Sequence, residues 1–122
     1  MGNLIWVAAG GAIGATLRYL SSISIKFLYP TFPFGTLFVN LLGSFLIGLL
    51  MNYLENRNMP DNFIRYFIII GLLGSYTTFS AFSFEIIDLL NNKKIFISFI
   101  YILLSVFSCL FFAFIGYNIN KI

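Results

Sequence analysis

The chain is poor in the residue types that most often build catalytic and metal sites. It contains no histidine, and Cys109 is its one cysteine. A single thiol cannot form an intrachain disulfide, and without histidine a transition-metal site or a histidine proton relay is poorly supported. No pairing of a nucleophile with a base can be drawn either, so the sequence does not predict an enzyme.

Charge is also scarce. Charged residues make up 9% of the 122, with seven Lys and Arg, four Asp and Glu, and a formal net charge of +3. This excess is ordinary for a bilayer protein, in which anionic headgroups attract basic side chains, and it predicts no nucleic-acid partner. The three prolines lie within 26–34 and 55–62, two stretches that we interpret as loops between helices.

Most of the remaining sequence is apolar, with 60% hydrophobic residues and a mean hydropathy of +0.96. A helix needs about 20 apolar residues to cross a bilayer. Four such runs can be drawn, at about 4–25, 35–54, 63–90 and 95–116, and they leave no room for a domain outside the membrane. The first run has no basic segment before it, so we expect a retained helix rather than a cleaved signal. The sequence therefore predicts an all-α integral membrane protein, with 1–122 forming a single multi-pass domain.

The third run is too long for one plain crossing, and its centre is polar. Gly71, Gly74 and the β-branched pair Thr77-Thr78 all lower helix propensity, which predicts a break between about 74 and 78. Such a break frees carbonyl oxygens that can coordinate Na⁺. The alternative is a glycine kink in which neighbouring hydroxyls satisfy the backbone.

Polar residues also recur at helical spacing in the second and fourth runs, forming one line on each helix. These lines comprise Thr36, Asn40, Gly43, Ser44 and Gly48, and then Tyr101, Ser105, Ser108 and Cys109. An Asn within a membrane is most often an interhelical hydrogen-bond clamp. Its amide can also donate two hydrogen bonds to an anion, and the sequence leaves both interpretations of Asn40 open.

Two further features permit a packing or a functional interpretation. Phe79 and Phe82 share a helix face, where their rings either pack or present their electropositive edges to an anion. Arg18 is either an anchor that reaches the headgroups or part of a vestibule that attracts anions. Gly10 and Gly14, four residues apart in the first run, predict a close approach of another helix.

The basic residues are almost evenly divided between the two membrane sides. With four helices, Arg57, Arg65 and Lys121 fall on one side, and Lys26, Lys93 and Lys94 on the other, near which Arg18 also lies. Since Lys and Arg asymmetry sets orientation, this balance predicts insertion both ways up. A protein that inserts both ways can form an antiparallel homodimer, which would also cover the polar lines.

Three motifs together are similar to those of the Fluc (CrcB-type) fluoride channels. They are Gly10-Gly-x-x-Gly-Ala-x-x-Arg-Tyr19, Gly35-Thr-Leu-x-Val-Asn-x-x-Gly-Ser44 and Gly71-x-x-Gly-x-x-Thr-Thr-Phe-Ser-x-Phe-Ser-x-Glu85. The likeness covers nearly the whole chain, in the same order. It implies an antiparallel, dual-topology homodimer in the cell inner membrane, with two fluoride pores built from both subunits.

The resemblance also implies site residues. Phe79 and Phe82 would line the pore, with Asn40 near the fluoride path. Carbonyls of Gly74 and Thr77 from each subunit would hold a central structural Na⁺. Arg18 would lie near a vestibule, and the hydroxyls of the polar track would come from Thr36, Ser80, Ser83, Tyr101, Ser105 and Ser108.

One departure and two alternatives remain. Ala81 stands where family members often have Thr, so one hydroxyl of the track is missing, and Glu85 has no assigned role. The main alternative is a proton-coupled transporter of the small multidrug-resistance type, which uses a carboxylate in its first helix. Here the membrane carboxylates, Glu85 and Asp88, lie in the third run. The other alternative, a non-transporting membrane subunit, predicts no ion flux.

Overall fold

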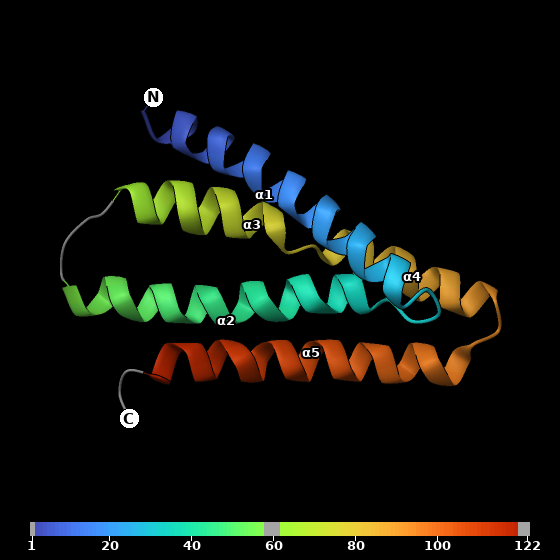
Figure 1. The fold of residues 1–122 in the computed structure, drawn as a ribbon. Coiled ribbons are helices and arrows are strands. Elements are labelled where there is room, and N and C mark those ends of the chain that lie inside the picture. Colours follow the sequence, from blue (N-terminus) through green and yellow to red (C-terminus); the bar gives the residue numbers. More distant parts are fainter. Residues whose placement is uncertain (1, 58–61, 120–122) are drawn as a thin grey trace.

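The computed structural model describes residues 2–57 and 62–119, and the regular structure in this part of the chain is helical (Figure 1). The elements are α1 (Gly2–Leu28), α2 (Phe34–Arg57), η1 (Phe63–Leu73), α3 (Gly74–Tyr76), α4 (Phe79–Asn91) and α5 (Ile95–Asn118). Four stretches are long and apolar enough to cross a membrane, namely Gly2–Leu28, Phe34–Asn56, Phe63–Asn91 and Ile95–Asn118. The prediction of four membrane-spanning helical segments is confirmed.

The connections between the spans follow from local chemistry. Pro30 and Pro33 lie between α1 and α2, where no helical N–H donor is required of them. After α4, Lys93 adopts a left-handed φ of 60°, and its N–H donates to the Leu90 carbonyl at 3.0 Å. This tight turn returns the chain into α5.

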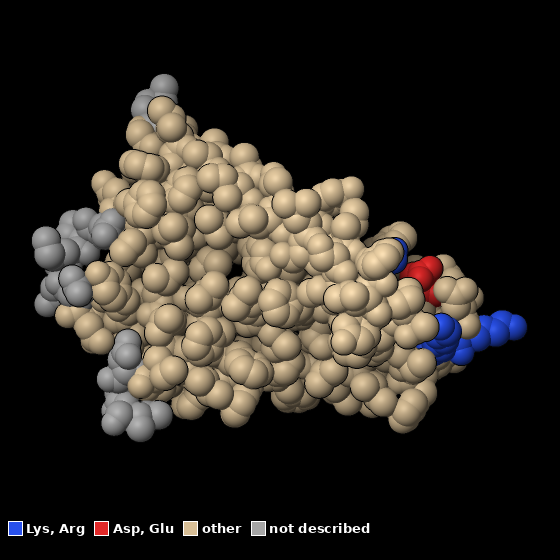
Figure 2. Space-filling model, viewed as in Figure 1, with Lys and Arg blue, Asp and Glu red and all other residues tan. Residues whose placement is uncertain are grey.

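The connections and termini divide between the two ends of the molecule. The start of α1, the end of α2, the start of η1 and the end of α5 lie at one end, and the connections at 29–33 and 92–94 lie at the other (Figure 1). On the face shown in Figure 2, the visible charged side chains gather at this second end, and the middle is uncharged. Lys121 and the side chain of Arg57 lie outside what the structure describes.

Glycines allow the spans to pack in two close pairs, α1 with η1 and α2 with α5. A Cβ on Gly10 would lie 2.3 Å from the Phe67 carbonyl oxygen, and one on Gly14 would lie 2.2 Å from that of Leu72. In the second pair, a Cβ on Gly48 would lie 2.1 Å from the carbonyl oxygen of Ala113. Since these neighbours are backbone atoms, a side chain would force the helices apart. The close approach predicted at Gly10 and Gly14 is confirmed.

Candidate functional site

Two residues of extended backbone separate α3 from α4. Thr77 has φ −79° and ψ 154°, and Thr78 has φ −151° and ψ 118°. Gly74, in contrast, is helical, with φ −61° and ψ −32°. The residues that leave helical geometry are therefore the β-branched pair, whose side chains favour extended conformations.

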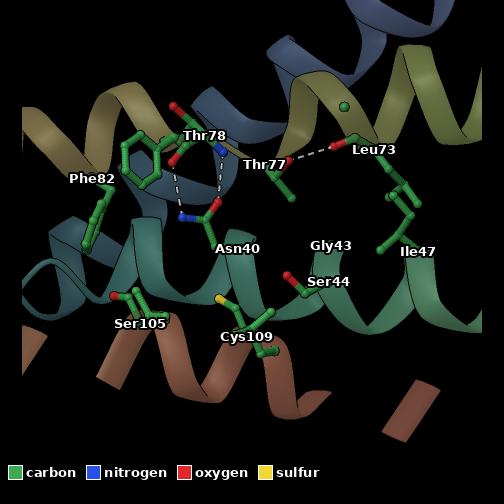
Figure 3. A pocket seen from close by; sticks show the side chains of 14 residues that line it. Asn40, Gly43, Ser44, Ile47, Leu73, Thr77, Thr78, Phe82, Ser105 and Cys109 are labelled. Carbon is green, nitrogen blue, oxygen red and sulfur yellow. Dashed lines mark hydrogen bonds between the residues drawn. The ribbon is translucent and has the colours of Figure 1, made fainter. Parts of the chain in front are cut away.

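The side chain of Asn40 in α2 binds both backbone groups of Thr78 (Figure 3). Its Nδ2 donates to the Thr78 carbonyl at 3.1 Å, and its Oδ1 accepts from the Thr78 N–H at 2.8 Å. The Thr78 hydroxyl in turn accepts from the Ala81 N–H at 3.1 Å, which caps the start of α4, and lies 3.0 Å from the Ser80 hydroxyl. These bonds hold the extended segment against α2 and satisfy its polar groups.

The same bonds leave two carbonyl oxygens without their usual helical donors. In a continuous α-helix, the Gly74 and Thr77 carbonyls would accept from the N–H groups of Thr78 and Ala81. Those two N–H groups are instead bound by the Asn40 amide and the Thr78 hydroxyl. Oxygen atoms of this kind are the ligands that hard cations prefer. The backbone at Gly74 and Thr77 therefore has the right donor chemistry for a cation such as Na⁺.

A cavity of about 430 Å³ lies beside this extended segment (Figure 3). Its walls come from α2, α5 and both sides of the extended pair. The lining residues are Asn40, Gly43, Ser44, Ile47, Leu73, Gly74, Thr77, Thr78, Phe79, Phe82, Ser105, Val106, Cys109 and Leu110. Most of the wall is apolar, and the polar groups are few and spaced along it.

The two phenylalanines at the cavity are in different environments within one chain. Phe82 is 7% exposed and packs on Tyr101 with ring centroids 5.1 Å apart, whereas Phe79 is 76% exposed. Their own ring centroids are 5.4 Å apart. Phe82 thus belongs to the hydrophobic core of the chain, together with Leu37, Leu89 and Tyr101, while the Phe79 ring projects from it.

Beyond Phe82, the half-buried carboxylate of Glu85 accepts hydrogen bonds from two buried side chains. Thr36 donates to one carboxylate oxygen at 2.7 Å, and Tyr101 donates to the other at 2.8 Å. Thr36, Glu85 and Ala81 also line a second cavity of about 290 Å³, which Lys26 lines as well. The sequence assigned Glu85 no role, because neither hydroxyl is near it in the chain.

The other predicted site residues have varied surroundings. The hydroxyls of Ser83 and Ser108 donate to the carbonyls of Phe79 and Leu104, one turn back in their own helices. Cys109 lines the larger cavity, and Ser108 does not. Sequence periodicity could not distinguish these two residues, because they are adjacent in the chain. Arg18, in α1, lines neither of the two cavities described above.

Comparison with known sequences bears on this site. A profile of the family described as "CrcB-like protein, Camphor Resistance (CrcB)" matches residues 5–117. A protein of Flavobacterium psychrophilum named fluoride-specific ion channel FluC is 45% identical over 122 residues, which is 99% of this chain and 98% of that protein. A protein of the same name from Campylobacter jejuni is 43% identical, over 99% of this chain and 99% of its own length. Another from Rhizobium meliloti is 45% identical, over 87% of this chain and 86% of its own length.

Proposed function

Because the chain belongs to the CrcB-like family of membrane proteins, we propose that it is a fluoride-selective ion channel that lets F⁻ leave the cell down its gradient. The observation that carries this proposal is the similarity over nearly its whole length to proteins named for fluoride conduction. Fluoride enters a cell as neutral HF and ionises inside, so a passive path is enough for export. Neither ATP nor a coupled ion gradient is needed, and the inner membrane is the expected location.

The chemistry of the cavity wall supports passage of a small anion. Fluoride is strongly hydrated, so a selective path must replace water with hydrogen-bond donors while binding loosely enough for release. Asn40 and Ser105 are the proposed donors on the wall of the larger cavity. The other residues proposed along the path are Thr36, Ser80, Ser83, Tyr101 and Ser108. Four of these hydroxyls, those of Thr36, Ser83, Tyr101 and Ser108, would have to release bonds within the chain to donate to fluoride. Phe79 and Phe82 would present their ring edges at the narrow point, since these edges are electropositive. Arg18 would attract anions from a vestibule.

An antiparallel homodimer would complete two such paths. In one chain the Phe79 ring is 76% exposed and the cavity beside it lies open to the outside of the helix bundle. A partner subunit inserted the other way up would cover this ring and bring its own rings to the same region. Two equivalent pores then follow from the twofold axis, and the near-balance of basic residues supports the required dual topology.

A sodium ion at the twofold axis would use the carbonyls of Gly74 and Thr77 from each subunit. Both carbonyls lack their usual helical donors in this structure, because the Thr78 and Ala81 N–H groups are bound elsewhere. A bound cation would supply positive charge near an anion path and would hold the two extended segments together. In this chain, the Asn40 amide binds the Thr78 backbone and so holds the extended segment that leaves those carbonyls without helical donors.

The test is fluoride efflux from liposomes that contain the purified full-length protein, followed with a fluoride electrode, with chloride efflux as the comparison. We expect rapid release of F⁻ and little release of Cl⁻. Release that required a proton gradient would favour a coupled transporter of the small multidrug-resistance type. A well-folded dimer that released neither ion would favour a non-transporting membrane subunit and would contradict the channel.

A further inference from the structure

The second cavity, of about 290 Å³, lies between α1 and α4. Both helices end close to it, at the end of the molecule that holds the connections at 29–33 and 92–94 (Figure 1). A Cβ on Gly35 would lie 2.9 Å from the Ser22 carbonyl oxygen, so α1 packs tightly on the start of α2 there. Contact between α1 and α4 is slight in comparison, and the cavity occupies the space between them.

Opposite charges line the two sides of this cavity. Lys26 comes from α1, whereas Glu85 and Asp88 come from α4. The Glu85 carboxylate is held by the hydroxyls of Thr36 and Tyr101, so its position is set before any ligand arrives. The volume is near the lower end of the range for small-ligand pockets, about 300–1,000 Å³. A hollow with one ammonium group and two carboxylates complements a molecule that carries both signs of charge.

The cavity lies at the depth of lipid headgroups. Lys26 is in the last turn of α1, and Asp88 is in the last turn of α4. Since one turn rises about 5.4 Å, both charges lie close to the ends of membrane spans. Phe84 also lines the cavity, is 71% exposed, and lies one turn closer to the middle of the membrane than Asp88. Charges on the water side and an apolar ring on the membrane side match the two parts of a phospholipid.

The proposed dimer contact uses a different face of α4. At about 100° per residue, Phe79 and Asp88 lie on opposite faces of this helix. A partner subunit that packed on the Phe79 face would therefore leave to lipid the side of α4 that lines the second cavity.

We propose that the second cavity binds the headgroup of a zwitterionic phospholipid that ends in a primary ammonium, phosphatidylethanolamine. The ammonium would donate hydrogen bonds to Asp88 and Glu85, and the phosphate would pair with Lys26. Phosphatidylcholine is fully methylated on nitrogen and has no N–H group to donate. Phosphatidylglycerol brings a phosphate charge but no cation for the carboxylates. The site goes beyond the proposed function, because lipid binding requires no ion conduction.

The test is a titration of the purified full-length protein in detergent with each lipid, followed by native mass spectrometry. The lipids share the same acyl chains and comprise phosphatidylethanolamine, its N-methyl and N,N-dimethyl derivatives, phosphatidylcholine and phosphatidylglycerol. We expect one phosphatidylethanolamine per chain, bound at least about tenfold more tightly than phosphatidylcholine, or roughly 1.4 kcal/mol. Affinity should fall stepwise as methyl groups replace N–H donors.

Two variants remove the charges with little change in side-chain size. Asp88→Asn and Lys26→Gln should each lower the affinity for phosphatidylethanolamine at least about tenfold, and Asp88→Asn should also remove the dependence on methylation. Both positions are exposed, so each variant should fold. Because a ligand stabilises the state that binds it, phosphatidylethanolamine should raise the melting temperature of the wild type more than that of either variant.

Lys94→Gln is the matched control, because Lys94 lies at the same end, is exposed and lines neither cavity. It should bind phosphatidylethanolamine as the wild type does. An equal loss in Lys94→Gln and Lys26→Gln would show that the basic end as a whole attracts lipid, and would overturn the site. Equal affinity of the wild type for phosphatidylethanolamine and phosphatidylcholine would refute the ammonium contact. A protein that binds the lipid as expected but conducts no fluoride would refute the channel function alone.

Discussion

At the scale of single residues, Asn40 has the clearest physical role. The sequence permitted a clamp or an anion donor, and the structure shows two bonds from its amide to the backbone of Thr78. One Nδ2 hydrogen is left for another acceptor, because the amide carries two donors. The clamp is thus observed, and any contact with fluoride would use the second hydrogen alone.

Substitution of Asn40 should therefore impair stability as well as flux. Asn40→Asp keeps an acceptor for the Thr78 N–H but faces the Thr78 carbonyl with an oxygen, and Asn40→Ala loses both bonds. Each unsatisfied buried group costs about 1–3 kcal/mol. We expect a lower melting temperature and slower fluoride efflux for both variants, whereas Asn92→Ala, at the exposed end of α4, should change neither. Slower flux at an unchanged melting temperature would mean that Asn40 acts only as a fluoride donor.

The two phenylalanines should respond differently to the same substitution. Phe82→Ile removes a ring that packs on Tyr101 in the core. We expect it to lower the free energy of unfolding by roughly 1–3 kcal/mol, more than the loss of one methyl group does and less than Phe→Ala does. Phe79→Ile changes a ring that one chain leaves exposed. We expect both to slow fluoride efflux with the dimer intact, but only Phe82→Ile to lower thermal stability. Phe114→Ile, at an exposed ring in α5, is the control and should change neither flux nor stability. Unchanged flux in both Phe79→Ile and Phe82→Ile would show that the rings take no part in conduction.

At the scale of elements, the contact between α2 and the extended pair decides the shape of the cavity. A Cβ on Gly43 would lie 2.1 Å from the Thr77 methyl carbon Cγ2, and the next nearest atom, the Thr77 Cβ, is 3.6 Å away. A real Cβ essentially never approaches another carbon so closely. Glycine at this position therefore lets Thr77 pack on α2 and keeps its carbonyl where the proposed cation would bind.

This contact predicts a specific rescue. Gly43→Ala should displace Thr77 and slow fluoride efflux at least about tenfold, or roughly 1.4 kcal/mol in barrier height. Thr77→Ser removes the methyl group and keeps the hydroxyl, so the double variant Gly43→Ala/Thr77→Ser should recover most of the rate. Efflux assays on the two single variants and the double variant form the test. Additive losses in the double variant would show that the Cβ of residue 43 acts elsewhere.

At the scale of the whole molecule, the proposed dimer would have to cover the surface that one chain leaves exposed beside the larger cavity. One chain leaves the Phe79 ring and the rim residues Val106 and Leu110 exposed. Lipid could cover these side chains as well as protein could, since lipid tails are as apolar as leucine. The polar part of the wall is different, because hydroxyls and freed carbonyls need polar partners, which an antiparallel second chain with an ion path would provide.

The dual orientation can be measured with one introduced thiol. Asn92 is exposed in the turn between α4 and α5. In Cys109→Ser/Asn92→Cys, a maleimide that cannot cross membranes should label about half of the protein on intact cells, and the rest only after permeabilisation. A lysine added at this end, in place of the exposed Asn91, should hold this end in the cytoplasm and lower fluoride export. If the variant without added lysine were labelled completely, or not at all, on intact cells, the antiparallel dimer would be excluded.

The sequence by itself determined the membrane class, the four spans and the close approach at Gly10 and Gly14. These properties depend on local composition and spacing: apolar length decides what can cross a bilayer, and small residues decide where backbones can meet. The tertiary structure alone decided which groups face one another. It paired Asn40 with Thr78, placed Thr36 and Tyr101 on Glu85, and put Cys109 rather than Ser108 at the cavity. The reason is that packing sets the rotation of each helix about its axis, and hydropathy does not encode that rotation.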